Sequence, residues 1–204
     1  MKKHLLNIFL VLILLTGLSL LLYPTVSDYW NSFHQSRAIS SYNAAVSNMD
    51  TEQYQEVLSK AKSYNRAIAE NGMHWTMTEE EMQEYEETLD LGGGPMGYIE
   101  IPRIREKLSI YHGTSESVLQ TGIGHVEGSS LPVGAESWTV KEGRYKSSGV
   151  RDMTDGSHCV LSGHRGLPSA RLFTDLDKLV VGDTFTLTIL NETLTYEVDQ
   201  IRIV

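Results

Sequence analysis

The sequence predicts a mainly β protein, a small β-barrel or sandwich, preceded by a membrane helix and a helical segment. Three observations lead to this prediction. An apolar run lies near the start of the chain, apolar residues then recur at helical spacing as far as residue 72, and short alternating segments follow residue 96.

The apolar run extends from Leu5 to Tyr23. A helix rises about 1.5 Å per residue, so these 19 residues nearly span a hydrocarbon core of about 30 Å. Lys2 and Lys3 precede the run, which favours a cytoplasmic N-terminus. A cleaved signal peptide is the alternative, but its apolar region is shorter and small residues precede its cleavage site. The sequence therefore favours an uncleaved, single-pass anchor over residues 1–27.

Residues 28–72 are predicted to form a helical stalk. Asp50 followed by Gln53 resembles a capping box, so a second helix is expected to begin there and to stop at Asn71-Gly72. Both helices are expected to pack on a larger body rather than to hold a cofactor. Their apolar faces contain Ile39, Tyr42, Val46 and Met49 in the first, and Tyr54, Val57, Leu58, Ala61, Tyr64 and Ile68 in the second.

Residues 73–95 form an acidic segment that ends in a Gly-rich linker, Gly92–Pro95. An acidic run is usually a solvated helix face or a loop. A metal site is the alternative, but no fixed ligand spacing supports it. The linker predicts a domain boundary before residue 96.

The β pattern begins at Gly97–Pro102 and continues at Lys107–Tyr111, with one helical turn expected at 115–120. Residues 129–134 are expected to form a loop that ends in a short strand. Residues 138–156, rich in Lys, Arg, Gly and Ser, predict a surface loop or an exposed hairpin.

A β-hairpin is predicted near the end of the sequence. Phe185 to Ile189 alternates, Asn191-Glu192 turns the chain, and Leu194 to Val198 alternates back. The apolar positions then shift to Ile201 and Ile203, which predicts a bulge near residues 199–200 within a continuing strand.

The candidate catalytic residue is His164. The apolar run Cys159–Leu161 predicts a buried strand that delivers this histidine to a turn between Gly163 and Gly166, before a helical segment that starts at Pro168. Imidazole is the side chain most easily tuned to hold or release a proton near neutral pH, and the glycines would leave the ring reachable.

Composition excludes several classes of function. The net charge is −9 and no basic stripe follows residue 40, which argues against nucleic-acid binding. The single cysteine, Cys159, excludes an internal disulfide and a cysteine-rich zinc site. A metal cluster of His158, Cys159 and His164 is a minor alternative. We expect neither a metal nor another cofactor.

Several motifs in order are similar to those of the sortases, and more narrowly to the class C, pilin-polymerising branch of Gram-positive bacteria. The resemblance covers residues 96–137 and 157–204. It is carried by Met96–Pro102, Ile110–Thr114, Gly124–Pro132, Ser162–Pro168 and Leu172–Asp177.

The resemblance implies an eight-stranded β-barrel, here a partial one over residues 96–204, on the outer side of the cell membrane. It also implies a cysteine transpeptidase for pilus assembly that cleaves LPXTG-like signals of pilins or surface proteins between Thr and Gly. The acyl group is held as a thioester until a lysine of a second pilin subunit accepts it. His164 matches the family's histidine, the proton donor to the leaving amine.

The family's nucleophile lies in a Thr-Leu-X-Thr-Cys strand after the histidine, and its arginine lies on the next strand. Neither motif occurs in the 204 residues. Cys159 precedes His164 by five residues, about 16 Å of strand, and points to the opposite sheet face, so it is expected to be a buried hydrophobe. The truncated chain is therefore expected to be inactive. The alternatives are a membrane-tethered remnant or a module that binds sorting signals.

Class C sortases usually close the active-site groove with a lid that carries an Asp-Pro-aromatic motif. No Asp-Pro occurs in this sequence. Trp75, preceded by His74, lies in the corresponding region and is the candidate plugging residue. Residues 138–156 are an insertion relative to the family pattern.

Overall fold

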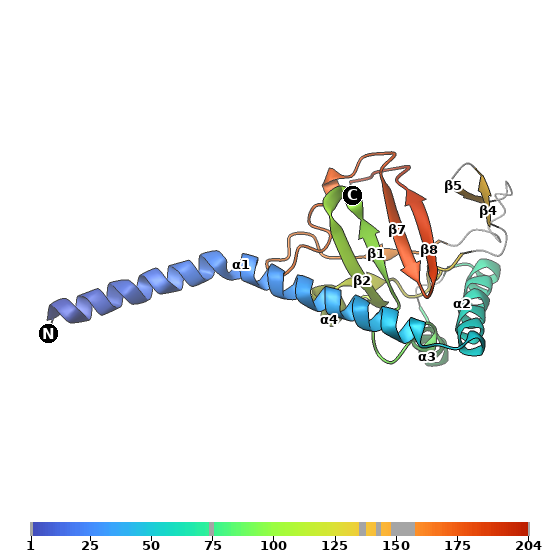
Figure 1. Ribbon diagram of the computed structural model, residues 1–204, viewed down its shortest axis with the longest axis horizontal. Helices are drawn as coiled ribbons and strands as arrows, with labels where there is room; N and C mark the ends of the chain where they lie inside the picture. The colour runs from blue at the N-terminus through green and yellow to red at the C-terminus, as the bar shows by residue number, and fades with distance from the viewer. Residues whose placement is uncertain (1, 74–75, 135–137, 142–143, 148–157, 204) are drawn as a thin grey trace.

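A mixed six-stranded sheet forms the centre of the molecule (Figure 1). The computed structural model describes residues 2–73, 76–134, 138–141, 144–147 and 158–203. The sheet order is β6-β3-β2-β1-β7-β8, and all neighbours are antiparallel except β2 and β3. Its strands are β1 Gly97–Ile101, β2 Glu106–His112, β3 Ile123–His125, β6 Leu161–Ser162, β7 Thr184–Ile189 and β8 Glu192–Glu197. The predicted mainly β fold is confirmed.

The parallel pair of β2 and β3 requires a crossover, because a tight turn joins only antiparallel neighbours. Helix α4, Glu116–Thr121, provides it. The hydroxyl of Ser115 accepts a hydrogen bond from the amide of Val118 (3.4 Å) and so caps the first turn. The helical turn predicted at 115–120 is confirmed. The first residue of α4, Glu116, lies near His164, which follows the edge strand β6.

Helix α1, Lys2–Ser47, is continuous from the apolar run to the sheet. Among the described residues it is the one helix that is long and apolar enough to cross a membrane. Its apolar N-terminal part is exposed and projects away from the sheet, while its C-terminal part crosses β1 and β2 (Figure 1). The predicted change from anchor to stalk near residue 27 therefore involves no break in the helix.

Two polar side chains fix α1 to the sheet. Gln35 is buried, and its Oε1 accepts a hydrogen bond from the amide of Ser109 on β2 (2.7 Å), while its Nε2 donates to the carbonyl of Thr121. Two turns further on, the hydroxyl of Tyr42 accepts from the amide of Leu190, at the turn between β7 and β8 (2.6 Å). Ile39 and Val46 of α1 are also buried, so apolar packing holds the helix and these hydrogen bonds fix its position along the sheet.

Replacing Gln35 by leucine is expected to lower the free energy of unfolding by about 2–4 kcal/mol. Leucine fills similar space, but it leaves a buried amide and a carbonyl without partners, each of which costs about 1–3 kcal/mol. Urea unfolding in detergent micelles measures the loss. The matched control is Gln55→Leu on an exposed face of the second helix, which should change stability by less than about 0.5 kcal/mol. Equal effects of both variants would contradict the role of Gln35.

Helix α2, Thr51–Asn71, begins at the predicted capping box. The Asp50 carboxylate accepts from the Gln53 amide (2.8 Å), and the Gln53 side chain accepts from the Asp50 amide (3.2 Å). Its predicted apolar face is confirmed, because Leu58, Ala61, Tyr64 and Ile68 are buried. Asn65 additionally exchanges two hydrogen bonds with the backbone of Leu131, at 2.7 and 2.9 Å, which ties α2 to the loop after β3.

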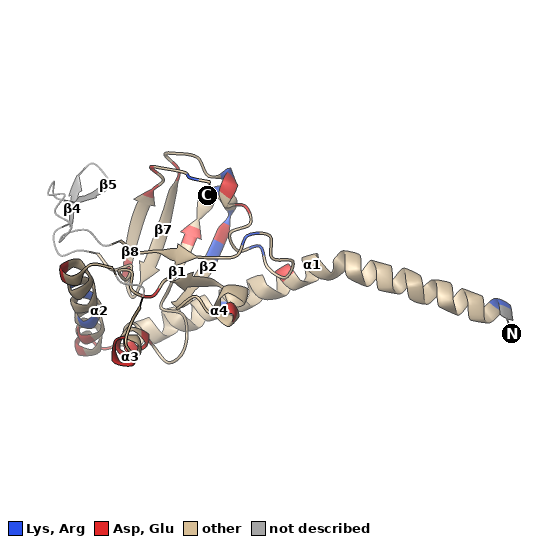
Figure 2. Ribbon diagram, turned by 180° about the vertical axis from the view of Figure 1, so that it is seen from behind, with Lys and Arg blue, Asp and Glu red and all other residues tan. Residues whose placement is uncertain are grey.

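The acidic segment forms helix α3, Glu79–Glu87. Its glutamates colour α3 red in Figure 2, and most of them are exposed, as predicted. The opposite face of the segment is buried, since Tyr85 is fully inaccessible and Leu89 nearly so. The acidic segment therefore has one solvated face and one face that packs in the hydrophobic core.

Three expectations for the β region are wrong in detail. No strand forms within residues 129–134. The run Cys159–Leu161 contributes only Leu161 to a regular strand. The strand predicted to continue to Ile203 ends at Glu197, and no bulged continuation follows. Ile201 and Ile203 are 51% and 98% exposed, because no described strand lies beside them.

Part of the 138–156 insertion is described. Trp138–Lys141 (β4) and Arg144–Ser147 (β5) pair as an antiparallel hairpin, one of the two predicted forms. The remaining positions of the insertion lie outside the described residues.

Candidate active site

His164 lies two residues beyond β6, at the edge of the sheet. The backbone at the preceding Gly163 approaches two apolar side chains so closely that a Cβ there would lie 2.6 Å from Ile123 and 2.7 Å from Phe173. Glycine is thus required for close packing at this position. The amide of Phe173 donates to the carbonyl of His164 (3.1 Å), which closes the turn.

The imidazole of His164 faces the crossover helix. Its side chain is 34% exposed, and its Nε2 lies 3.8 Å from a carboxylate oxygen of Glu116, the first residue of α4. The Nε2 atom itself is buried and has no hydrogen-bond partner among the described residues. The ring is therefore reachable from solvent on one side, and an acidic side chain lies within ion-pair distance of its protonated form.

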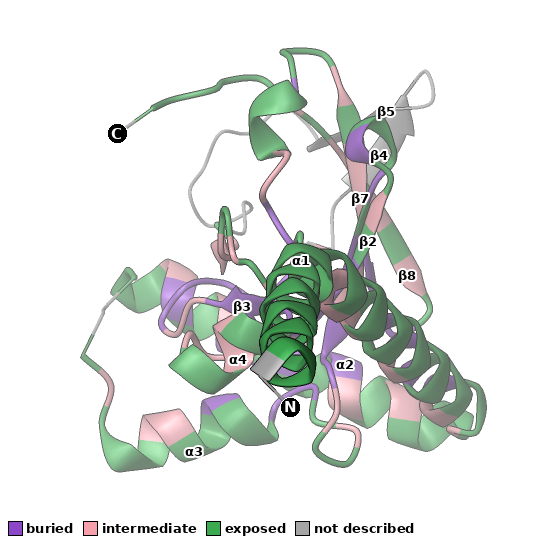
Figure 3. Ribbon diagram, turned by 90° about the vertical axis from the view of Figure 1, so that its left-hand side faces the viewer, coloured by how far each residue is buried: buried purple, intermediate pink, exposed green. Residues whose placement is uncertain are grey.

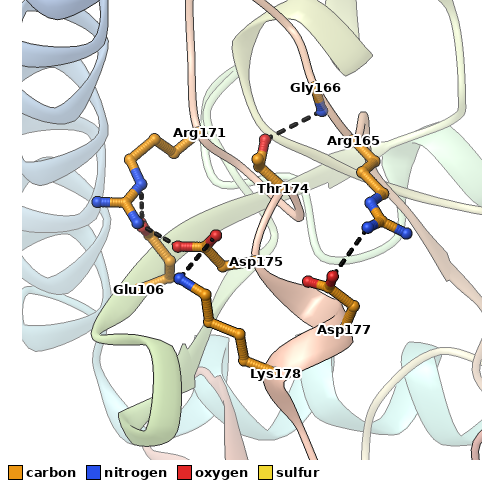
Figure 4. Close-up of polar contacts among 8 residues, drawn as sticks. All are labelled: Glu106, Arg165, Gly166, Arg171, Thr174, Asp175, Asp177 and Lys178. Carbon is orange, nitrogen blue, oxygen red and sulfur yellow. Dashed lines mark hydrogen bonds and ion pairs between the residues drawn. The ribbon is translucent and has the colours of Figure 1, made fainter.

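The segment after His164 is held by two polar contacts. Arg165 Nη2 donates to Asp177 Oδ2 (2.9 Å), and the amide of Gly166 donates to the hydroxyl of Thr174 (3.0 Å) (Figure 4). The helical segment predicted from Pro168 is wrong. The chain instead forms successive turns that end in the short 3₁₀ helix η2, Leu176–Lys178, because these contacts fold it back toward His164.

Arg171 joins this segment to the rest of the molecule (Figure 4). Its guanidinium forms an ion pair with Asp175, and its Nε lies 3.6 Å from Glu106 on β2. Its amide donates to the Asp28 carboxylate of α1 (2.8 Å). Lys178 also contacts Asp175 (3.0 Å), and Lys178 together with Arg171 lowers the pKa of that carboxyl. These charges fasten the turn that follows the histidine to both α1 and β2.

Cys159 is half-buried in this fold. Burial raises the pKa of its thiol to about 12, because desolvation disfavours the charged thiolate. Neutral thiol is a poor nucleophile, so these surroundings support the prediction that Cys159 packs as a hydrophobe. They do not suit a nucleophile that must ionise near neutral pH.

Native Cys159 is expected to react with iodoacetamide at pH 8 about a thousandfold more slowly than the same thiol in urea. The reason is the small thiolate fraction of a group whose pKa lies near 12. Mass spectrometry of time points measures both rates on the same residue, so the unfolded chain is its own control. Equal rates in the two states would establish Cys159 as an accessible thiolate.

A buried cluster beneath α3 connects three rings. The Tyr85 hydroxyl accepts from the amide of Gly113 and lies 3.0 Å from both the Nδ1 and the carbonyl oxygen of His125. The Nε2 of His125 donates to the carbonyl of Ser130 (2.8 Å), which leaves Nδ1 as the acceptor. The Nε2 of His112 donates to the carbonyl of Thr88 (2.6 Å). Burial lowers the pKa of both histidines, that of His125 to about 4, so neither is a proton donor near neutral pH.

The remaining predicted site residues are not brought together. His158, Cys159 and His164 form no metal-binding cluster, and the described part of the chain contains no group of three or more His, Cys, Asp or Glu suited to a metal ion. The lid candidates His74 and Trp75 lie outside the described residues.

Sequence reasoning missed Glu116 as a neighbour of His164. The two residues are 48 positions apart, and only the β2–α4–β3 crossover brings the helix start to the histidine turn. An acidic residue at the first position of a helix is a common feature near the positive end of the helix dipole, so the signal was too general to single it out.

Comparisons with known proteins agree with this geometry. A sortase domain profile matches residues 133–204. Sortase C1 from Streptococcus agalactiae is 51% identical, with a TM-score of 0.68 over 81% of this chain and 77% of that chain. A sortase C from Streptococcus pneumoniae is 34% identical, with a TM-score of 0.60 over 80% and 74%.

A lid mutant of sortase A from Corynebacterium diphtheriae is 31% identical, with a TM-score of 0.57 over 72% of this chain and 69% of that one. No curated protein sequence matched the chain. Extensive coverage at 51% identity, a shared curled sheet and the sortase domain match lead to one conclusion. The chain belongs to the sortase family, and its structural matches include class C sortases.

Proposed function

We propose that this chain supplies the histidine-bearing part of a class C sortase active site that cleaves LPXTG-like sorting signals. The observation that carries the proposal is the position of His164. Its ring is partly exposed at the edge of a sortase sheet, and Glu116 can form an ion pair with the imidazolium. The 51% identity to sortase C1 supports the same assignment.

In the proposed reaction, a cysteine thiolate attacks the carbonyl carbon of the Thr-Gly peptide bond. The tetrahedral intermediate collapses, the C–N bond breaks, and the leaving nitrogen takes a proton from the His164 imidazolium. A thioester remains. A lysine amine then attacks it, passes a proton to the neutral imidazole, and the thiolate departs as the new amide forms. The imidazole ends the cycle protonated, as it began.

The thiolate in this scheme is the cysteine of the family's Thr-Leu-X-Thr-Cys motif, which the 204 residues do not contain. Cys159 does not replace it, because its thiol is neutral at physiological pH. His164 therefore contributes the proton donor of the proposed site, and the 204-residue chain alone is expected to give no turnover.

The substrate class and the location are parts of the same proposal. The pneumococcal sortase C is described in connection with pilin substrate specificity, which supports pilins as substrates and a pilin lysine as the acceptor. The apolar part of α1 supports a membrane anchor. Lys2 and Lys3 before it favour a cytoplasmic N-terminus, with the sheet on the outer side.

A chimera tests the proposal. The segment of S. agalactiae sortase C1 that carries the cysteine motif and the arginine is fused after Val204, and the product is incubated with an LPXTG peptide and hydroxylamine. We expect a threonine hydroxamate, detected by mass spectrometry, which Cys159→Ala leaves unchanged. A folded chimera that neither releases the hydroxamate nor forms a thioester would contradict the proposal.

A further inference from the structure

An exposed apolar stripe continues along α1 beyond the predicted membrane span. Val26, Tyr29, Trp30 and Phe33 are 63%, 74%, 65% and 54% exposed. Successive residues of an α-helix are turned by about 100°, so positions 26, 29, 30 and 33 share one side of the helix. Large apolar side chains gathered in this way usually have a partner.

The opposite side of α1 is the one that holds the sheet. Asp28 accepts a hydrogen bond from the Arg171 amide, and Gln35 and Tyr42 are bonded to β2 and to the turn after β7. These positions are seven residues apart, two helical turns, so they lie on one line along the helix. The stripe therefore faces away from the sheet, and the part of α1 that projects toward the viewer in Figure 3 is exposed.

We propose that this stripe lies in the interface between the headgroups and the acyl chains of the bilayer. The proposal rests on the membrane anchor proposed above. The stripe begins three residues after the apolar run and consists mainly of Trp, Tyr and Phe, and Trp and Tyr are the side chains enriched at membrane interfaces. Arg37, exposed one turn beyond Phe33 on the same side, can reach phosphate groups with its guanidinium.

An upright helix does not satisfy this placement. Phe33 lies ten residues beyond Tyr23, about 15 Å along the axis. The polar layer on each side of a bilayer is about 5–8 Å thick, so the end of the stripe would stand clear of lipid. The segment after residue 24 must then be strongly inclined toward the membrane surface.

The shape of α1 permits this orientation. Pro24 lies within the helix, and proline interrupts the backbone hydrogen bonding that keeps a helix straight. The axis changes direction between the apolar part and the part beside the sheet (Figure 1). With the stripe on lipid, the sheet lies on the water side of α1. Asp28 lies in the same helical turns as the stripe, and its carboxylate accepts a hydrogen bond from the amide of Arg171. The turn after His164, which contains Arg171, therefore lies at the membrane-facing end of the molecule.

Tryptophan fluorescence of the full chain tests the placement. Trp75→Phe and Trp138→Phe leave Trp30 as the sole tryptophan, and the chain is reconstituted in phosphatidylcholine–phosphatidylglycerol vesicles. We expect a blue-shifted emission, strong quenching by phosphatidylcholine brominated near the headgroup end of its acyl chains, and little quenching by acrylamide. The control carries Trp30→Phe and Glu56→Trp, on an exposed part of α2, and should show the reverse.

Alkaline carbonate extraction of the same vesicles separates the two proposals. A chain that resists extraction while its Trp30 is quenched by acrylamide, and not by brominated lipid, would overturn the interfacial stripe and leave the anchor intact. If Trp30 were shielded from both acrylamide and brominated lipid, and two chains could be chemically crosslinked through this face, the stripe would pack on a second copy of the chain. That result would also overturn the interfacial placement. Extraction of the chain would overturn the anchor itself, and the stripe proposal with it.

Discussion

Replacing His164 by glutamine in the sortase C1 chimera is expected to lower kcat/KM for an LPXTG peptide by about 10²–10⁴-fold. This is the range that a positioned general acid contributes. Glutamine has a similar size and keeps a polar end, but it cannot give a proton to the departing nitrogen. The rate of hydroxamate release measures the effect, and circular dichroism verifies that the variant is folded.

His158→Gln is the matched control. His158 is exposed and lies six residues before His164, and its backbone carbonyl accepts a hydrogen bond from the amide of Ser130 in the loop after β3 (3.1 Å). The control should keep the full rate. A chimera with His164→Gln that also kept it would show that another group protonates the amine.

The choice of leaving group separates a proton donor from a residue that only shapes the site. A p-nitrophenyl ester of the Leu-Pro-X-Thr peptide has a leaving group that departs without protonation, so its acylation should be nearly insensitive to His164→Gln. With the peptide substrate, His164→Gln should still lower the rate by the full factor. If the variant slowed both substrates equally, His164 would act by positioning other groups of the site rather than by donating a proton. Its contact with Glu116 would then be the contact to test next.

Local patterns explain why the helical part of the fold could be predicted from the sequence. The capping box at Asp50 and Gln53 involves residues three positions apart, and the buried face of α2 repeats every three or four residues. Such interactions are set before any tertiary contact forms. Gln35 gave no such signal. Its partners Ser109 and Thr121 lie 74 and 86 residues away, so its role depends on the finished fold.

The acidic segment shows how a strong pattern concealed a weaker one. Glutamates dominate residues 79–87 and predict a solvated helix, yet Met82 and Tyr85 are three residues apart in the same helix, and Leu89 follows four positions later, just past its end. That spacing marks an apolar helix face. Tyr85 is inaccessible in the fold, is hydrogen-bonded to the buried His125, and packs edge-on against the half-buried His112.

Tertiary contacts also decided the segments that were predicted wrongly. After Pro168, the contacts of Arg165 and Gly166 with Asp177 and Thr174 favour turns over an α-helix. Beyond Glu197, alternation alone predicted a strand, but a strand needs a neighbour for its backbone hydrogen bonds. The resemblance to the sortases located His164, although its contact with Glu116 required the structure.

Tyr85→Ala is expected to lower the free energy of unfolding by about 3–5 kcal/mol, as for other large aromatic residues removed from a core. Tyr85→Phe should lower it by about 1–3 kcal/mol, because the ring remains but the Gly113 amide and the His125 Nδ1 lose their partner. Urea unfolding in detergent measures both. The control Tyr98→Phe, at a half-buried position on β1, should change stability by less than about 0.5 kcal/mol. A loss in Tyr98→Phe equal to that in Tyr85→Phe would contradict the role of the Tyr85 hydroxyl.

The buried His125 and the half-buried His112 should make the same protein sensitive to acid. The pKa of His125 is lowered by burial to about 4 from an ordinary value near 6.5, so between these values the unfolded chain binds a proton that the folded chain does not. Stability is therefore fully present above pH 6.5 and is lost as the pH falls to 4, by about 3 kcal/mol from this residue. Burial also lowers the pKa of His112, which adds to the loss in the same direction.

His125→Gln separates this residue from the general effect of acid. Glutamine can still donate to the carbonyl of Ser130, but it does not titrate. The free energy of unfolding of this variant should therefore fall less between pH 6.5 and pH 4, by the amount assigned to His125. Glu127 acts against the effect, since its charge favours the protonated ring. Stability that rose as the pH fell would mean that Glu127 outweighs burial and that His125 is charged within the fold.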